Sequence, residues 1–226
     1  MGLGLVSDAL TLMRCSRKGL SENELQQLLA ASLPRPQVFT ELILALDIVT
    51  RNRSGLISLI NGHAEQAVEK RYMSATAKKQ INSEDVHERL AGFFEALLNS
   101  APNSAAVPFR VLMELPYHMY TMVTLATTSS TAQSVPSTNR KSSNAEQKSG
   151  EKEKEDKRRS ARLERGRRRL RDMLTDSNTG ALAFDALFTT ANKFDLYRYW
   201  RLLQPEPLKV AEVYQRLASS LDGFTN

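Results

Sequence analysis

The sequence predicts a mainly α-helical protein: a winged helix of three helices and a β-hairpin, followed by a helical bundle that a disordered basic tract interrupts. Three observations indicate this fold. Aliphatic residues recur at helical spacing along most of the 226 residues. A polar turn lies between two short apolar segments at only one place. Aromatic residues make up only 7% of the chain, and ten glycines and eight prolines are too few for a glycine-rich β protein.

Residues 1–62 are predicted to form the winged helix. The first helix covers residues 3–17, and Gly19 closes it. Ser21 and Glu24 have the spacing of a capping box, in which each side chain accepts a hydrogen bond from the other residue's backbone N–H. This box starts a second helix that ends before Pro34, and a third follows over residues 36–47. Their apolar stripes are Leu5, Ala9, Leu12 and Met13; Leu25, Leu28 and Leu29; and Val38, Leu42, Ala45 and Leu46.

The hairpin is predicted from residues 48–60. Ile48 and Val49 are β-branched, residues 51–55 form a polar turn, and residues 56–60 are a short apolar run. Three helices closed by a hairpin is the winged-helix arrangement, in which the hairpin is the wing.

Residues 63–126 are predicted to be a further helical region. Ser83, with Glu84 and Asp85 in the following turn, marks one helix start. Another helix begins near Ala106. Because proline removes an internal hydrogen bond, we expect a break there, with one piece ending at Leu115 and the next starting at Pro116.

Residues 127–161 contain almost no large apolar side chain, so we expect a disordered linker. The net charge of +6 is concentrated in this part of the chain: residues 138–171 hold 14 Lys and Arg against 6 acids, which leaves the rest at −2. Residues 162–226 are predicted to be a C-terminal helical region. Its apolar stripes include Leu163, Leu170, Met173 and Leu174, then Leu196, Tyr199, Trp200 and Leu203.

A single cysteine, Cys15, cannot form an intramolecular disulfide, so nothing requires an oxidising compartment. The N-terminus has no basic region before its apolar stretch, and no window has the roughly 20 apolar residues of a membrane helix. We therefore expect a cytoplasmic protein without a membrane span, with a ciliary or nuclear location left open.

Four segments resemble NACHT-type STAND ATPases of the nephrocystin-like and telomerase-associated group. C-S-R-K-G-L-S-E-N-E-L at residues 15–25 resembles the opening of the winged helix in that family. G-H-A-E-Q-A-V-E-K-R-Y at residues 62–72 and E-L-P-Y-H-M at residues 114–119 resemble two later motifs. Residues 193–203 are similar to the stretch that leads toward tetratricopeptide repeats.

The resemblance implies a winged helix and the helical region after it, without the nucleotide-binding core that precedes them in the family. We therefore expect either a fragment of a longer ATPase or a stand-alone derivative. The implied partners are other proteins, among them a nucleotide-binding core and tetratricopeptide repeats in a longer chain.

No catalytic, cofactor-binding or metal-binding residues are predicted. The sequence has no Gly-x-x-x-x-Gly-Lys-Ser/Thr phosphate loop, so we expect no ATPase activity and no enzyme. His63, His87 and His118 are far apart and lack a metal-binding motif. A structural role is the favoured interpretation for His118.

Two further interpretations concern single residues. Cys15 lies near Arg14 and Arg17, which could lower its pKa and make it reactive, but a small, partly buried residue is favoured because no base or partner cysteine accompanies it. Trp200, with Tyr197 and Tyr199, could form a binding patch, but core packing is favoured.

The sharpest local feature is a basic run at residues 157–171. It could bind a polyanion such as nucleic acid, anionic lipid or an import receptor, or it could be a solvated junction between linker and helix. The candidate polyanion-binding residues are Lys157, Arg158, Arg159, Arg162, Arg165, Arg167, Arg168, Arg169 and Arg171.

The favoured function is a non-catalytic protein-interaction or regulatory module, a scaffold within a STAND-type ATPase. The alternative is a nucleic-acid-binding winged-helix protein that uses the basic run. The third helix of the winged helix disfavours the alternative, because residues 36–47 contain no Lys or Arg but include Glu41 and Asp47. Any nucleic-acid binding is therefore expected to be non-specific.

Overall fold

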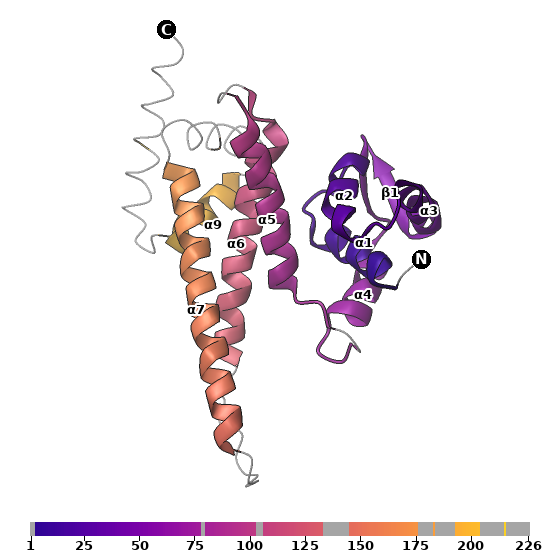
Figure 1. Ribbon diagram of the computed structural model, residues 1–226. Coiled ribbons are helices and arrows are strands. Elements are labelled where there is room, and N and C mark those ends of the chain that lie inside the picture. The colour runs from indigo at the N-terminus through magenta and orange to yellow at the C-terminus, as the bar shows by residue number, and fades with distance from the viewer. Residues whose placement is uncertain are drawn as a thin grey trace. The chain divides into compact units, whose positions relative to one another are not determined.

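A computed structural model describes residues 3–77, 80–102, 106–132, 145–175, 183, 193–203 and 215 (Figure 1). The chain divides into two compact units, Met1–Phe94 and Glu95–Asn226. The described residues are mainly helical, with one small antiparallel hairpin, which confirms the predicted fold class.

The first unit begins with three helices, α1 (Leu3–Cys15), α2 (Glu22–Leu29) and α3 (Pro36–Leu46). The predicted capping box is present at the start of α2. The Ser21 hydroxyl accepts from the Glu24 N–H at 3.2 Å, and the Ser21 N–H donates to the Glu24 carboxylate at 2.7 Å. Short 3₁₀ turns follow α2 at Ala30–Ser32 and α3 at Asp47–Val49.

The hairpin consists of β1 (Thr50–Arg53) and β2 (Leu56–Leu59), paired antiparallel from Thr50↔Leu59 to Arg53↔Leu56. Its two turn residues, Ser54 and Gly55, both have positive φ, as a tight two-residue hairpin requires. This order of three helices and a hairpin is the winged-helix order that the sequence predicts.

A short bridge joins the hairpin to the loop between α1 and α2. Leu20 and Ile57 exchange backbone hydrogen bonds of 2.9 Å and 2.8 Å, so the loop acts as a third, single-residue strand. The helices and β2 then bury one core. Its members are Leu5, Ala9, Leu12, Met13, Leu20, Leu25, Leu29, Leu42, Leu46, Ile57 and Leu59.

Two further helices continue the first unit. α4 (Gly62–Val68) is capped by the Asn61 side chain and passes into a π-helical turn at Glu69–Met73. Arg14 of α1 donates to Glu69 at 3.1 Å. α5 (Ser83–Ser100) starts in this unit, where Arg89 lies 3.7 Å from Asp8 and donates to the Leu28 carbonyl oxygen.

The second unit is built around the long helices α6 (Phe109–Ala132) and α7 (Ala145–Thr175), with α9 (Lys193–Leu203) against both. Figure 1 shows α6 and α7 side by side and running in opposite directions. Leu115, Met119, Val123, Leu170 and Trp200 are among the buried side chains between these helices.

The predicted break at Pro116 is wrong, because α6 is continuous through this proline. An internal proline removes one backbone hydrogen bond and costs about 3 kcal/mol. Apolar side chains on both sides of Pro116 are buried in the same unit, including Leu112 and Leu115 before it and Met119 and Met122 after it. Burial of these apolar side chains offsets the cost of the proline. Helix propensities of single residues do not include this burial, so the sequence-based prediction missed it.

The predicted disordered linker also differs from the structure at both of its ends. α6 continues to Ala132, and α7 begins at Ala145, while residues 133–144 lie outside the described residues. The lack of apolar side chains suggested disorder, but Glu, Lys and Arg are good helix formers. Glu153 with Lys157 and Glu155 with Arg159 have the i, i+4 spacing that favours a solvated helix.

Much of the predicted C-terminal helical region, residues 162–226, stays a prediction. Residues 176–182, 184–192, 204–214 and 216–226 lie outside the described residues. Among the helices that the structure does describe, none combines the length and the apolar character needed to cross a membrane.

The bridge between Leu20 and Ile57 generates the first testable prediction. Gly19 has φ +95°, and a Cβ atom there would lie 2.6 Å from the Ile57 carbonyl oxygen. Gly19→Ala should therefore lower the free energy of unfolding by more than about 2 kcal/mol, through backbone strain and the displaced bridge. Urea denaturation followed by circular dichroism measures the loss.

Gly55→Ala is the matched control. Gly55 also has positive φ, but a Cβ atom there meets nothing within 4 Å. We expect a smaller loss of about 1 kcal/mol, from the backbone conformation alone. Equal losses for the two variants would show that the close approach of Gly19 to Ile57 does not contribute to stability.

Candidate functional site

The basic run lies on α7. One face of this helix is buried, and the opposite face is exposed. Leu170, Met173 and Leu174 are buried with Gly166, and Leu163 is half-buried. These positions follow the helical repeat and form one stripe that packs against α6. The cations on the opposite face, Lys157, Arg158, Arg165, Arg168 and Arg171, are exposed.

Two predicted polyanion-binding residues belong to the packed side of α7. Arg169 makes a two-pronged contact with Glu95 of α5, at 3.2 Å from Nε to Oε1 and 2.5 Å from Nη2 to Oε2. Arg167 is half-buried, and its Nε has no hydrogen-bond partner among the described residues. The side chains of Arg159 and Arg162 lie outside the described residues. The structure therefore brings five of the nine predicted residues together on one exposed face.

Gly166 explains how α7 comes close to α6. A Cβ atom there would lie 2.7 Å from Cε of Met122 and 2.8 Å from Cγ2 of Val123. The absence of a side chain thus permits a close helix–helix approach in the middle of the basic run. Sequence reasoning missed this role, although a glycine inside a helical pattern was the available signal.

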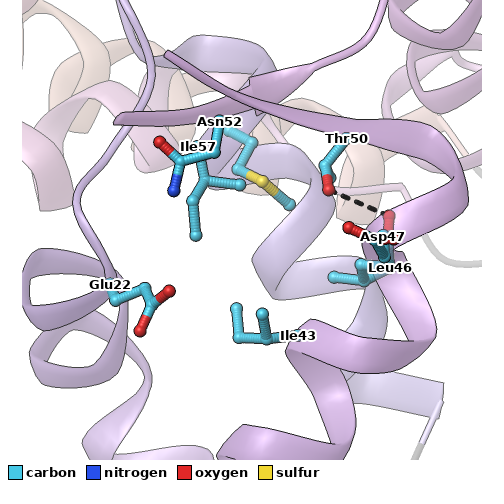
Figure 2. Close-up of a pocket in the computed structure, with 8 residues that line it drawn as sticks. Glu22, Ile43, Leu46, Asp47, Thr50, Asn52 and Ile57 are labelled. Atoms are coloured by element: carbon cyan, nitrogen blue, oxygen red, sulfur yellow. Dashed lines mark hydrogen bonds between the residues drawn. The ribbon is translucent and has the colours of Figure 1, made fainter. Parts of the chain in front are cut away.

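A second candidate site is a small hollow in the first unit, between α2, α3 and the hairpin (Figure 2). Its volume is about 120 Å³, and its apolar wall consists of Met13, Ile43, Leu46 and Ile57. Its polar lining is Glu22, Asp47, Thr50 and Asn52. Figure 2 shows Asn52 and Ile57 of the hairpin across the opening from Ile43 of α3, with Glu22 of α2 at one side.

A hydrogen bond beside the hollow links two of the segments that line it. The Thr50 hydroxyl donates to the Leu46 carbonyl oxygen at 3.0 Å, which ties the start of β1 to the end of α3. Small-molecule sites usually occupy 300–1,000 Å³. A hollow of about 120 Å³ suits a single side chain better than a nucleotide or another cofactor. Sequence analysis did not find this site, because its lining comes from four separate segments.

The outward face of α3 adjoins the hollow and carries exposed aliphatic side chains. Leu44 is 71% exposed, and Ile48, in the 3₁₀ turn after α3, is 84% exposed, whereas Phe39, Leu42 and Leu46 on the opposite face of α3 are buried. Glu41 lies on the same face as Leu44, three residues before it. This helix occupies the position of the third helix of a winged helix, and it exposes apolar and acidic groups with no cation.

Two of the three histidines that the sequence analysis considered are buried. His118 is completely buried, with Nε2 3.4 Å from Oε2 of Glu114, and Arg110 Nη1 lies 3.5 Å from Oε1 of the same carboxylate. The burial fits a structural histidine. His87 is also buried, whereas His63 is exposed. Among the described residues, no cluster of three metal-binding side chains occurs.

The aromatic cluster of α9 belongs to the core of the second unit. Trp200 and Tyr199 are buried, and the Tyr199 ring lies 5.1 Å from that of Tyr120 on α6. Tyr197 is exposed. Core packing, the favoured interpretation, is confirmed for two of the three aromatic residues.

Cys15 is buried at the end of α1, and burial raises the pKa of its thiol to about 12. The neighbouring Arg14 opposes this rise, and Glu69 adds to it, but loss of solvent has the larger effect on the pKa. The favoured interpretation of Cys15 as a small buried residue is confirmed, and its low reactivity stays a prediction.

The second prediction concerns this thiol. In the folded protein Cys15 should react with iodoacetamide far more slowly than in urea, because its thiolate is suppressed and its sulfur is buried. Its contribution to stability should be complete below pH 9 and should be lost as pH rises toward 12, by up to about 1.4 kcal/mol per pH unit.

The Cys15→Ala variant isolates that contribution, because it removes the thiol and leaves the other titrating groups in place. The difference in unfolding free energy between wild type and variant should shrink as pH rises from 9 to 12. A difference that stays constant over this range would contradict the raised pKa.

The third prediction tests the sorting of cations on α7. Arg169→Gln should lower the unfolding free energy by about 1 kcal/mol, because it breaks a partly buried two-pronged ion pair with Glu95. Arg168→Gln, on the exposed face, should change it by less than about 0.5 kcal/mol. Urea denaturation of the two variants tests this, and equal effects would place both side chains in the same environment.

Comparison with known proteins finds one informative similarity. Over 203 residues the chain is 25% identical to a TPR repeat-containing protein of Dictyostelium discoideum. The aligned part covers 90% of this chain and 9% of the length of that relative. No family model matches the chain, and no solved structure matches it. The chain is thus a helical module that is similar, over most of its length, to one segment of a much longer repeat protein.

Proposed function

We propose that the chain is a non-catalytic protein-interaction or regulatory module of the kind that follows the nucleotide-binding core in NACHT-type STAND ATPases. The outward face of α3 carries the proposal. In a DNA-binding winged helix this face must meet phosphates and base edges, which requires cationic and hydrogen-bonding side chains. Here it exposes Leu44, Ile48 and Glu41, and such a surface suits a protein partner.

The segments that resemble the family support this proposal, because each has a defined structural role. Residues 15–25 include the loop that bridges to Ile57 and the capping box of α2. Residues 62–72 run from the start of α4 into its π-helical turn. Residues 114–119 hold the buried pair of Glu114 and His118. Motifs of this kind maintain a scaffold and supply no catalytic group.

The relative supports the same proposal at a coarser level. The name of that protein refers to TPR repeats, and this chain is similar to about a tenth of it. We propose that the present module likewise acts beside repeat-built surfaces and a nucleotide-binding core in a longer chain. Its role there would be to pass the state of the core to a bound protein.

The fourth prediction follows from the missing phosphate loop. Calorimetric titration of the purified chain with Mg-ATP should give no saturable heat, and the chain should release no phosphate from ATP. Binding to a defined site with one-to-one stoichiometry would contradict the proposal and would favour an enzyme.

A second candidate function is non-specific nucleic-acid binding, which the exposed cations of α7 favour. Lys157, Arg158, Arg165, Arg168 and Arg171 are exposed on one helix face, and clustered cations release counterions from a polyanion. Among the described residues of this basic face there is no exposed aromatic side chain for base stacking. Such binding would therefore be strongly salt-dependent and insensitive to base sequence.

The fifth prediction tests that candidate with a variant neutralised at Arg165, Arg168 and Arg171. Binding of a short DNA duplex by the wild type should weaken steeply between roughly 50 mM and 200 mM salt. The triple variant should bind more weakly, with a log–log salt slope shallower by about two to three. The control replaces Arg51 and Arg53 of the hairpin with Gln. If this control loses binding and the triple variant does not, the winged helix is the nucleic-acid site.

A further inference from the structure

The outward face of α3 and the hollow beside it form one continuous surface. Glu41 and Leu44 are spaced i, i+3 on the outward face of α3, and Ile48 follows in the 3₁₀ turn Asp47–Val49, where it is also exposed. Ile43 and Asp47 form the next ridge around the helix and line the hollow. Because Leu44 lies three residues before Asp47, the exposed aliphatic side chains border the mouth of the hollow.

The size of the hollow limits what can enter it. Its volume of about 120 Å³ is well below the 300–1,000 Å³ of a typical small-molecule site. Half of the lining, Met13, Ile43, Leu46 and Ile57, offers contact to an aliphatic group, and the other half, Glu22, Asp47, Thr50 and Asn52, is polar. These two properties fit one branched aliphatic side chain, such as that of leucine or isoleucine.

The charged residues that line this surface are acidic. Glu22 and Asp47 line the hollow, and Glu41 lies on the outward face of α3. All three carboxylates are exposed, and none forms an ion pair with a residue that the structure describes. Residues 36–50 contain no Lys or Arg. A complementary ligand therefore carries cations beside its aliphatic group.

The arginines of the hairpin do not cancel this charge. Successive side chains of a strand point to opposite faces, and Asn52 lines the hollow. Arg51 and Arg53, on either side of Asn52 in β1, therefore face away from the hollow. Arg51 also donates to the Ser58 hydroxyl of β2 at 3.3 Å.

We propose that this surface docks a basic segment of a partner protein, which places one aliphatic side chain in the hollow. Leu44 and Ile48 extend the apolar contact along α3, and Lys or Arg side chains of the segment pair with Glu22, Glu41 and Asp47. This proposal rests on the proposed function, because it names the partner chemistry of that interaction module. Apolar burial supplies most of the affinity, and the carboxylates select a cationic partner and reject an acidic one.

The test uses the full chain and a short synthetic peptide with leucine at every third or fourth position and lysine between. Fluorescence anisotropy measures its affinity, and two-dimensional NMR of the labelled protein locates the contact. We expect shifts at Glu22 and along residues 41–48. A second peptide with glutamate in place of lysine should bind at least tenfold more weakly.

Matched variants test whether the peptide binds this surface or another exposed apolar group. The double variant Leu44→Ser and Ile48→Ser should weaken binding of the lysine peptide at least tenfold, with an unchanged melting temperature because both side chains are exposed. Phe109→Ser, at a residue that is 55% exposed in the second unit, should leave the affinity unchanged. No binding, shifts confined to other segments, or equal binding of the glutamate peptide would each overturn the proposal.

Analytical sedimentation of the free chain tests whether a second copy of the chain, in place of a partner segment, occupies this surface. We expect a monomer. A dimer that the double variant dissociates would overturn the assignment of a basic partner segment. The titration with Mg-ATP uses no peptide, so failure of this docking proposal and failure of the proposed function are told apart.

Discussion

In two described helices, α3 and α7, burial of one apolar stripe fixes which other side chains remain in water. Burial of Phe39, Leu42 and Leu46 of α3 leaves Leu44, and Ile48 in the 3₁₀ turn after it, exposed. In α7, burial of Leu170, Met173 and Leu174 directs Arg165, Arg168 and Arg171 outward. Both candidate surfaces are consequences of core packing, since rotation of either helix by one residue would bury charge and expose the core.

The two surfaces differ in what they can discriminate. The exposed face of α7 offers charge with no large aliphatic side chain among its described residues, so its attraction acts at long range and weakens with salt. The surface on α3 combines carboxylates with two aliphatic side chains and a hollow, so it can distinguish partners by shape as well as by charge. We therefore regard α3 as the surface that confers specificity, and α7 as one that would add affinity for any polyanion.

Local chemistry in the sequence was sufficient to predict the order of three helices and a hairpin. The capping box of Ser21 and Glu24 is present, and the strands of a hairpin lie before and after Ser54 and Gly55. The predicted bounds of the hairpin are wrong, because Ile48 and Val49 belong to a 3₁₀ turn and residues 51–53 belong to β1. The continuity of α6 through Pro116 could not be predicted in this way, because it depends on packing against other helices. The same holds for Arg169, whose partner Glu95 is 74 residues away. The hollow was missed for the same reason, since contacts between distant segments create it.

The pair of Glu114 and His118 gives a physical reason for the E-L-P-Y-H motif. A carboxylate that is 1% exposed requires compensation, because a buried unpaired charge costs several kcal/mol. Arg110 and His118 lie one turn before and one turn after Glu114, so all three groups share one face of α6. Pro116 lies inside this stretch and gives up a backbone N–H, which leaves the carbonyl oxygen of Leu112 without its usual helical donor. The motif therefore combines a weakened backbone with a buried ionic group, and only a continuous, well-packed helix can accommodate both. Residues on both sides of the proline are buried within this one helix.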